Sequence, residues 1–278
     1  MRNSLLFRLV VLAVAMMCAL GVNAQEAYAW YSPGTNSLTF CYDNERSVCV
    51  GTTYDLNDGV TEPGWITDGN SAYVKHVAFH HSFADVRPTS TYHWFYEMSN
   101  LESITGMNYL NTSEVAHMDA MFNRCYKLTS LDLSGFNTSN VMDLSEMFRG
   151  SSALRTIYVG DGWRLSDMAQ TFSRDVFNGC TSLVGGKGTA YDASHVDAGY
   201  AHIDGGPSNP GYFTEKTDFI RGDVDGDGSV DITDVSTLID LLLGDGIVSN
   251  PSADCNQDGV VDIADVSSLT DYLLSGAW

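Results

Sequence analysis

One sequence unit recurs four times in this 278-residue chain, and no other feature limits the possible fold as strongly. Each unit carries one phenylalanine and one leucine in the same register: Phe95 with Leu101, Phe122 with Leu128, Phe148 with Leu154, and Phe177 with Leu183. One unit is too short to bury a core by itself, whereas stacked units share a continuous row of apolar side chains. We therefore expect residues 70–217 to form a mainly β solenoid.

The segment MFNRCYKLTSLDLSGFNTSNV, residues 121–141, shows the unit most completely. LTSLDLSGF is expected to carry a short strand, and NTSN favours a turn because Asn and Ser side chains hydrogen-bond to the nearby backbone. The unit resembles the BspA-like leucine-rich repeat family of bacterial surface proteins over roughly residues 70–215. This resemblance implies an adhesin or binding scaffold that recognises a macromolecular ligand rather than an enzyme.

The residues on either side of the repeats indicate where that region begins and ends. AYAWYSPGTNSLTFCYD contains two strand-like runs around Ser32–Asn36, which predicts a β-hairpin. We expect residues 25–69 to form a hairpin cap at the N-terminal end of the repeats. HIDGGPSNPGYF, residues 202–213, is rich in Gly and Pro and indicates that the repeats end there. Residues 218–278 are then a separate domain.

The N-terminus has the pattern of a secretory signal peptide. An apolar run over residues 5–20 follows Arg2 and leads to the small residues GVNA, with cleavage expected after Ala24. The run is too short for a comfortable membrane span, and no later run reaches that length. A lipoprotein signal at Cys18 is the weaker alternative, because Met17 stands where a small residue is needed. We expect a secreted or cell-surface protein without a transmembrane segment.

The negative charge is concentrated at the C-terminus. The formal net charge of the chain is −21, and residues 218–278 contain 13 aspartates with Arg221 as their one basic residue. Phosphate groups would repel such a chain, so the composition argues against a nucleic-acid partner. A high local density of carboxylates instead indicates a bound cation.

Two aspartate-rich loops, GDVDGDGSVDITD at 222–234 and ADCNQDGVVDIAD at 253–265, repeat the spacing of oxygen ligands in a calcium loop. Side chains at positions 1, 3, 5, 9 and 12 converge on the ion, the backbone carbonyl at position 7 completes the set, and a glycine at position 6 permits the turn. The sequence therefore predicts two Ca²⁺ ions. The expected ligands are Asp223, Asp225, Asp227, the Ser229 carbonyl, Asp231 and Asp234 in one loop, and Asp254, Asn256, Asp258, the Val260 carbonyl, Asp262 and Asp265 in the other.

A helix is predicted after each loop but not before it. Val235, Leu238 and Leu242 follow helical spacing, and similar apolar residues recur after the second loop. This loop–helix pair resembles a type I dockerin module over about residues 222–274. The resemblance implies a small all-α calcium-binding domain that docks onto a cohesin-like protein. Ile232–Thr233 and Ile263–Ala264 replace the hydroxylic pairs common in clostridial dockerins, so any cohesin must present a different face, more apolar or more basic.

The cysteines leave one question open. Cys41 and Cys49 flank YDNERSV and either bridge a hairpin or remain thiols. Cys125 and Cys180 occupy the same position two repeats apart, about 10 Å if successive strands are about 4.8 Å apart, which is too far for a disulfide. We interpret these two as buried apolar residues.

The sequence shows no catalytic motif, and we expect no enzymatic activity. The nearest constellation, His80–His81 with Asp85, lacks the pattern of a zinc protease or hydrolase. Three hypotheses follow: a surface binding protein with a docking module, an adhesin whose calcium module only stabilises its own C-terminus, and an enzyme hidden in the N-terminal region. We favour the first.

Overall fold

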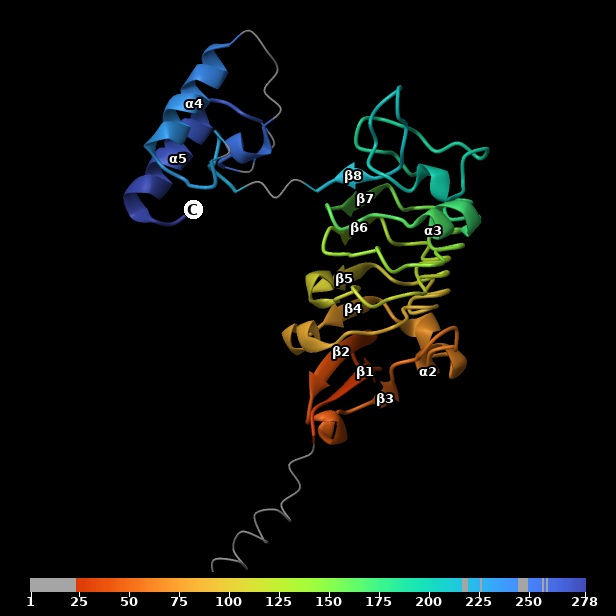
Figure 1. Ribbon diagram of the computed structural model, residues 1–278. Helices are drawn as coiled ribbons and strands as arrows, with labels where there is room; N and C mark the ends of the chain where they lie inside the picture. The colour runs from red at the N-terminus through yellow and green to blue at the C-terminus, as the bar shows by residue number, and fades with distance from the viewer. Residues whose placement is uncertain (1–23, 217–219, 226, 245–249, 257, 259) are drawn as a thin grey trace, which may run out of the picture. The chain divides into compact units, whose positions relative to one another are not determined.

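The computed structural model describes residues 24–216, 220–225, 227–244, 250–256, 258 and 260–278. The chain divides into two compact units, Met1–Lys216 and Thr217–Trp278 (Figure 1). The predicted signal peptide, residues 1–24, lies outside the described residues except for Ala24. Within the described ranges, no helix has the length and hydropathy needed to cross a membrane.

The first unit begins with a five-stranded mixed sheet in the order β3-β1-β2-β4-β5. Its strands are β1 (Glu26–Ser32), β2 (Ser37–Asp43), β3 (Thr52–Asp55), β4 (His76–Phe79) and β5 (Ser103–Thr105). β1 and β2 form an antiparallel hairpin that pairs Ser32 with Ser37, and Asn36 adopts the left-handed conformation that such a turn requires. The next two strands are added in parallel, since Val77 pairs with Ile104 one repeat later.

A second sheet of three parallel strands follows, in the order β6-β7-β8 (Figure 1). Its strands are β6 (Ser130–Leu133), β7 (Thr156–Val159) and β8 (Thr214–Glu215). Leu131 pairs with Ile157, again one repeat apart. Short helices connect the strands of this unit: α2 (Gly64–Thr67), α3 (Asp167–Phe172), and the 3-10 helices η1 (Arg46–Val48), η2 (Asn70–Tyr73), η3 (His81–Asp85), η4 (Met107–Tyr109) and η5 (Ala198–Tyr200).

The four repeat phenylalanines form a buried row inside the first unit. The ring centroids of Phe95 and Phe122 are 5.3 Å apart, those of Phe122 and Phe148 5.8 Å, and those of Phe148 and Phe177 5.6 Å. Separations of this size are within the range of favourable aromatic contacts. One hydrophobic core contains this row and extends from Ala29 in β1 to Phe213.

The four cysteines among the described residues of the first unit are free thiols. Cys125 and Cys180 are fully buried beside the phenylalanine row, and burial raises the pKa of both thiols. Cys41 and Cys49 line one cavity of about 380 Å³ and do not form the bridge that was one of the two alternatives. The hydroxyl of Tyr28 lies 3.6 Å from the Cys49 Sγ.

The prediction of a mainly β solenoid with a separate hairpin cap is wrong. The strands form two distinct sheets, one mixed and one parallel, and the hairpin belongs to the mixed sheet together with β4 and β5. The break in strand pairing between the two sheets has a local cause. Six positions separate Ile104 from Leu110, whereas five separate their counterparts Leu131 and Phe136. The extra residue lies in the turn of η4, directly after β5, and β5 does not pair with β6.

Left-handed backbone recurs in register with the repeats. Ala120 and Glu146 occupy the same place in successive repeats, and both have positive φ angles, 50° and 58°. Four residues further along each repeat, Arg124 and Gly150 are again equivalent, and their φ angles are 57° and 75°. A residue with a Cβ in this conformation costs about 1–2 kcal/mol relative to glycine. The repeat geometry therefore imposes backbone strain at fixed positions.

We predict that two buried Ala→Gly substitutions have different effects. Ala169→Gly, inside α3, should lower the free energy of unfolding by about 1 kcal/mol because glycine weakens a helix interior. Ala120→Gly should cost less than half of this, or stabilise the protein, because it relieves left-handed strain. Urea unfolding followed by tryptophan fluorescence measures both, since Trp278 alone among the five tryptophans lies outside the first unit. Equal destabilisation by the two substitutions would show that no strain is stored at Ala120.

Candidate functional site

The described residues of the second unit include two equivalent α-helices, α4 (Ile232–Leu243) and α5 (Ile263–Ser275), and the 3-10 helix η6 (Pro251–Ala253). Asp231 caps α4 and Asp262 caps α5, each through a capping box with the aspartate three residues later. Leu238 and Leu269 are the buried apolar residues of the two helices, and they pack with Val224, Ala253 and Cys255. A core this small provides little stabilisation by burial alone.

The first aspartate-rich loop brings three predicted ligands together. Ligand oxygens of Asp223, Asp225 and Asp227 lie within 4.8 Å of one another, and among the described residues no other group of three acids, histidines or cysteines does so. Backbone amides hold these carboxylates in place: the Gly228 amide donates to Asp223 at 3.1 Å and the Ser229 amide donates to Asp227 at 2.8 Å. Three carboxylates this close repel one another, and their oxygens suit a hard divalent cation.

The aspartate at position 12 connects this loop to α4. Asp234 is buried, and its Oδ1 accepts hydrogen bonds from the amides of Val224 at 2.6 Å and Asp225 at 3.1 Å. Its Oδ2 accepts from the amide of Asp231 at 2.8 Å. Asp231 and Ser229, the other two predicted ligand positions, are exposed. Because one carboxylate bonds to both the loop and the first turn of the helix, the loop and the start of α4 are ordered together.

The second loop repeats this architecture with a different set of charges. Asp265 is buried and accepts from the amides of Asn256 at 2.9 Å and Asp262 at 2.8 Å. The Asn256 side chain donates to Asp258 at 2.9 Å, and the amide of Asp258 donates to Asp254 at 3.1 Å. A neutral amide thus stands where the first loop has the carboxylate of Asp225. The Val260 carbonyl follows on the exposed part of the loop, and its role as a ligand stays a prediction, like that of the other ligand positions.

Both helices expose apolar side chains at equivalent positions. Ile232 and Ile263, at the first position of each helix, are 70% and 72% exposed, and Leu243 and Leu274 are 78% and 83% exposed. Ile239 is also exposed, between Ile232 and Leu243 on the same side of α4. Residues at spacings of seven and eleven lie on one face of a helix. Each helix therefore presents an outward apolar stripe that the small core does not use.

The two ends of this unit are in contact, which no sequence pattern predicted. The Arg221 guanidinium lies 4.1 Å from the ring centroid of Trp278, and Tyr272 stacks on the same ring at 4.2 Å. Arg221 also donates to the carbonyl of Cys255. A Cβ at Gly222 would lie 2.8 Å from the Trp278 ring, so glycine permits this close packing. The only signal in the sequence was a single Trp and a single Arg at opposite ends of the domain.

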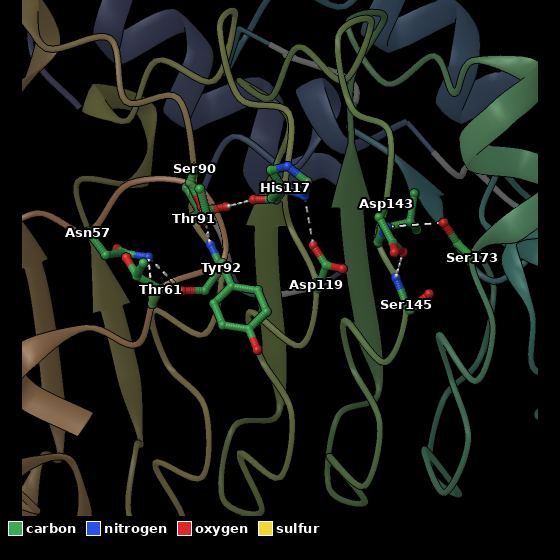
Figure 2. A network of polar contacts seen from close by, with 12 residues as sticks. Asn57, Thr61, Ser90, Thr91, Tyr92, His117, Asp119, Asp143, Ser145 and Ser173 are labelled. Carbon is green, nitrogen blue, oxygen red and sulfur yellow. Dashed lines mark hydrogen bonds and ion pairs between the residues drawn. The ribbon is translucent and has the colours of Figure 1, made fainter. Parts of the chain in front are cut away.

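A second polar cluster lies in the first unit and was also missed. Figure 2 shows Asp119 beside His117, with Asp143 on the next repeat. The His117 Nδ1 is 3.6 Å from the Asp119 Oδ2, and both atoms are buried without a hydrogen-bond partner. Burial and the neighbouring Asp143 carboxyl raise the pKa of Asp119 to about 7. These residues come together only because successive repeats stack in parallel register. The sequence alone does not show that register. His80, which belongs to the constellation noted in the sequence, is not part of this cluster. Its side chain accepts a hydrogen bond from the Ser82 amide at the start of η3.

We predict that Asp119 makes the first unit less stable as the pH rises from about 4 to about 7. The folded protein holds the Asp119 proton more tightly than the unfolded chain does, so stability is lost as the pH rises through the raised pKa of Asp119. Asp119→Asn should remove this slope and leave the variant more stable than the parent above pH 7. Urea midpoints at pH 5, 6, 7 and 8 measure the effect.

Asp132→Asn is the matched control for this substitution. Hydrogen bonds from Ser134 and the Lys216 ammonium lower the pKa of Asp132, although its partial burial opposes them. Ionised Asp132 therefore stabilises the folded protein above the ordinary pKa of an aspartate, and this stabilisation should not vary over the same pH range. A parent protein without a slope, or an Asp119→Asn variant that keeps it, contradicts the prediction.

Two segments of the chain match known families. Residues 221–274 match the family model of the Dockerin type I domain, and residues 85–197 match that of a Mycoplasma protein of unknown function, DUF285. Comparison with curated proteins found no match, and comparison with solved structures found none. Type I dockerin domains typically bind calcium. The aspartate-rich loops and the two helices of the second unit thus lie within a segment that is similar to the Dockerin type I domain, and this similarity suggests a protein-docking module.

Proposed function

We propose that this protein is an extracellular, non-catalytic binding protein whose second unit docks, when loaded with calcium, onto a cohesin-type partner. The observation that carries the proposal is the duplicated loop and helix. Each copy joins a calcium-type loop to a helix with exposed isoleucine and leucine at equivalent positions. A module that only stabilised its own C-terminus would not need two matching apolar stripes on its surface.

Calcium suits the loops better than other common cations. Their donors are carboxylate, amide and carbonyl oxygens, which are the ligands that Ca²⁺ prefers. The glycine at position 6 of the first loop, Gly228, has a φ angle of 90°, as the sharp turn of such a loop requires. We propose one ion in each loop, because Asp265 anchors the second loop as Asp234 anchors the first. Ca²⁺ would cancel the repulsion among the loop carboxylates and thereby order the start of each helix.

The docking face that we propose is the apolar stripe of each helix. On α4 it consists of Ile232, Ile239 and Leu243, and on α5 of Ile263 and Leu274, with Thr270 in the place of Ile239. Because the stripes are nearly equivalent, a partner can bind either helix, in two orientations related by the repeat. The concentration of aspartates around the stripes favours a partner whose apolar surface is bordered by basic residues.

The first unit supplies recognition in this proposal. Its resemblance to BspA-like repeats supports a macromolecular ligand, whereas the DUF285 family that residues 85–197 match is of unknown function. The apparent signal peptide and the occurrence of dockerin modules in extracellular proteins support secretion. The polar cluster of His117, Asp119 and Asp143 has a structural account: burial and the neighbouring Asp143 carboxyl raise the pKa of Asp119, so we propose no catalysis there.

Calcium removal should unfold the second unit and leave the first intact. Excess EGTA should abolish most of the circular dichroism at the helix minimum that comes from α4 and α5, because the loop carboxylates then repel one another. Tryptophan fluorescence of the first unit should not change. Asp227→Ala should weaken calcium binding roughly tenfold or more, whereas Asp240→Ala, on the exposed side of α4, should not. Full helicity in EGTA would contradict the prediction.

The docking role is tested with the full-length chain, immobilised in calcium buffer and exposed to the extracellular proteins of the source organism. We expect chelation to release a protein with a cohesin domain. Ile232→Asp and Ile263→Asp should each retain binding, because the other helix remains, and the double variant should lose at least about tenfold in affinity. Ile220→Asp, an exposed position outside both helices, is the control. An empty eluate from a folded protein would favour the alternative, a module that only stabilises its own C-terminus.

A further inference from the structure

The hairpin of β1 and β2 has one face inside the hydrophobic core of the first unit and one face outside it. Ala29, Leu38 and Phe40 belong to the core. Tyr28 and Cys41, which pair across the hairpin, are 1% and 7% exposed but are not members of that core. Successive residues of a strand point to opposite faces of its sheet, so this pair lies on the outer face. Its burial shows that another part of the chain covers this face.

Residues 45–50, which include η1, cover the outer face of the hairpin. The Trp30 indole nitrogen Nε1 donates to the Val50 carbonyl at 3.1 Å, and the Cys49 Sγ lies 3.6 Å from the Tyr28 hydroxyl. The cavity of about 380 Å³ is lined by the hairpin on one side and by this segment on the other. Small-molecule sites have volumes of about 300–1,000 Å³, so the cavity is large enough for a small organic ligand.

Much of the cavity wall is apolar. Tyr28, Trp30 and Cys41 contribute to it from the hairpin, and Val48 and Val50 contribute from the covering segment. Burial raises the pKa of the Cys41 thiol to about 11, so this group is neutral at neutral pH. Val48 and Val50 are 73% and 83% exposed. The apolar lining therefore continues to the open side of the cavity, where a ligand can reach it.

The charged groups of the cavity are two carboxylates without a basic partner. The Asp43 Oδ1 accepts from the Tyr28 hydroxyl at 2.8 Å and from the Glu45 amide at 2.9 Å. Among the described residues, no Lys, Arg or His nitrogen lies within 4.0 Å of the Asp43 or Glu45 carboxylate. The guanidinium of Arg46, next in the chain, forms ion pairs with two other acids. The negative charge in the cavity is thus uncompensated.

The two aromatic hydrogen-bond donors of the wall are already used. The Tyr28 hydroxyl donates to Asp43, and the Trp30 indole donates to the Val50 carbonyl. A carboxylate has about four lone-pair sites, so the carboxylates of the cavity can accept further hydrogen bonds. The cavity therefore offers free acceptors beside an apolar surface. A ligand whose donor group is positively charged matches both features, because charge-assisted hydrogen bonds are the stronger kind.

We propose that this cavity binds a small organic cation, an ammonium group joined to an apolar body. The ammonium would lie at the carboxylates of Asp43 and Glu45. The apolar body would contact Trp30 and the two valines, and an aromatic ring there would gain a ring–ring contact with the indole. The ligand class is thus an arylalkylamine. This inference depends neither on the docking role of the second unit nor on a macromolecular ligand of the first.

The probe is 2-phenylethylamine, titrated at neutral pH into the full-length chain in calcium buffer with a reductant and followed by isothermal titration calorimetry. Two control ligands separate the two parts of the site. 2-Phenylethanol has nearly the same shape without the charge, and methylamine has the charge without the ring. We expect each control to bind at least about tenfold more weakly, because it lacks either the charge-assisted hydrogen bond or the buried ring.

Variants of the chain locate the binding. Glu45→Gln removes a charge but keeps the shape, so it should weaken the amine at least about tenfold and leave 2-phenylethanol unchanged. Thr39→Tyr fills the cavity from β2 and should weaken both ligands at least about tenfold. Glu114→Gln, at an exposed position on the repeats, makes the same change of charge as Glu45→Gln and should stay within about twofold. Thermal midpoints identify any variant that fails to fold.

Cys49 allows a measurement that needs no variant. Its thiol is half-exposed, whereas the other described cysteines are buried, so iodoacetamide should modify Cys49 first among them. Mass spectrometry of the peptide that contains Cys49 gives the rate, after removal of the reductant. With 2-phenylethylamine at about ten times its Kd, the rate should fall about tenfold, because only the unoccupied protein reacts.

Three results would overturn the proposal. The first is equal binding of 2-phenylethylamine and 2-phenylethanol, which would show that the cavity does not select a cation. The second is an equal loss of amine binding in Glu45→Gln and Glu114→Gln, which would reduce the interaction to general attraction by an acidic protein. The third is the absence of binding to the folded parent protein, with no protection of Cys49. None of these results affects calcium-dependent docking, because that is measured with variants of α4 and α5.

Discussion

The stacking of each repeat on the next is the interaction on which the first unit depends. The amides of Phe95, Phe122 and Phe148 donate to carbonyls one repeat further along, at 3.0, 2.7 and 2.9 Å, and the three rings lie in one buried row with Phe177. Neither contribution is possible within one unit, because both partners come from different repeats. The same register also brings together side chains that are far apart in sequence. The contact between Asp119 and Asp143, with its raised pKa at Asp119, results directly from parallel stacking.

Because stacking depends on register, one additional residue has a large local effect. The turn after β5 is one residue longer than its counterpart after β6, and the ladder stops there. The hydrophobic core continues across the interruption, since Ile104 and Met107 still pack against it. Burial of apolar side chains tolerates a small change in strand separation, whereas a backbone hydrogen bond does not. The repeats thus remain one compact body while two strand edges stay open.

The limits of sequence reasoning for this chain follow from which patterns are local. The repeat period, the hairpin around Asn36 and the helices after the aspartate-rich loops depend on neighbouring residues, and the structure contains each of them. The fold class was wrong because continuous pairing was inferred from periodicity, and the extra residue before Leu110 carries no signal of its own. The contact of Arg221 with Trp278 and the cluster at His117 escaped prediction for the same reason. Their partners are brought together only by the complete fold.

The proposed role of the second unit depends on the electrostatic repulsion among its aspartates. We expect a unit with thirteen aspartates and a core of a few apolar residues to need a cation that compensates the charge. Asp234 and Asp265 make the coupling specific, because each accepts hydrogen bonds from its loop and from the first turn of its helix. A loop ordered by a cation would therefore also set the start of the helix, and the first residue of each helix is the exposed isoleucine of the docking face that we propose. In this proposal, occupancy of the loops and presentation of that face are one equilibrium, since the same carboxylates belong to both.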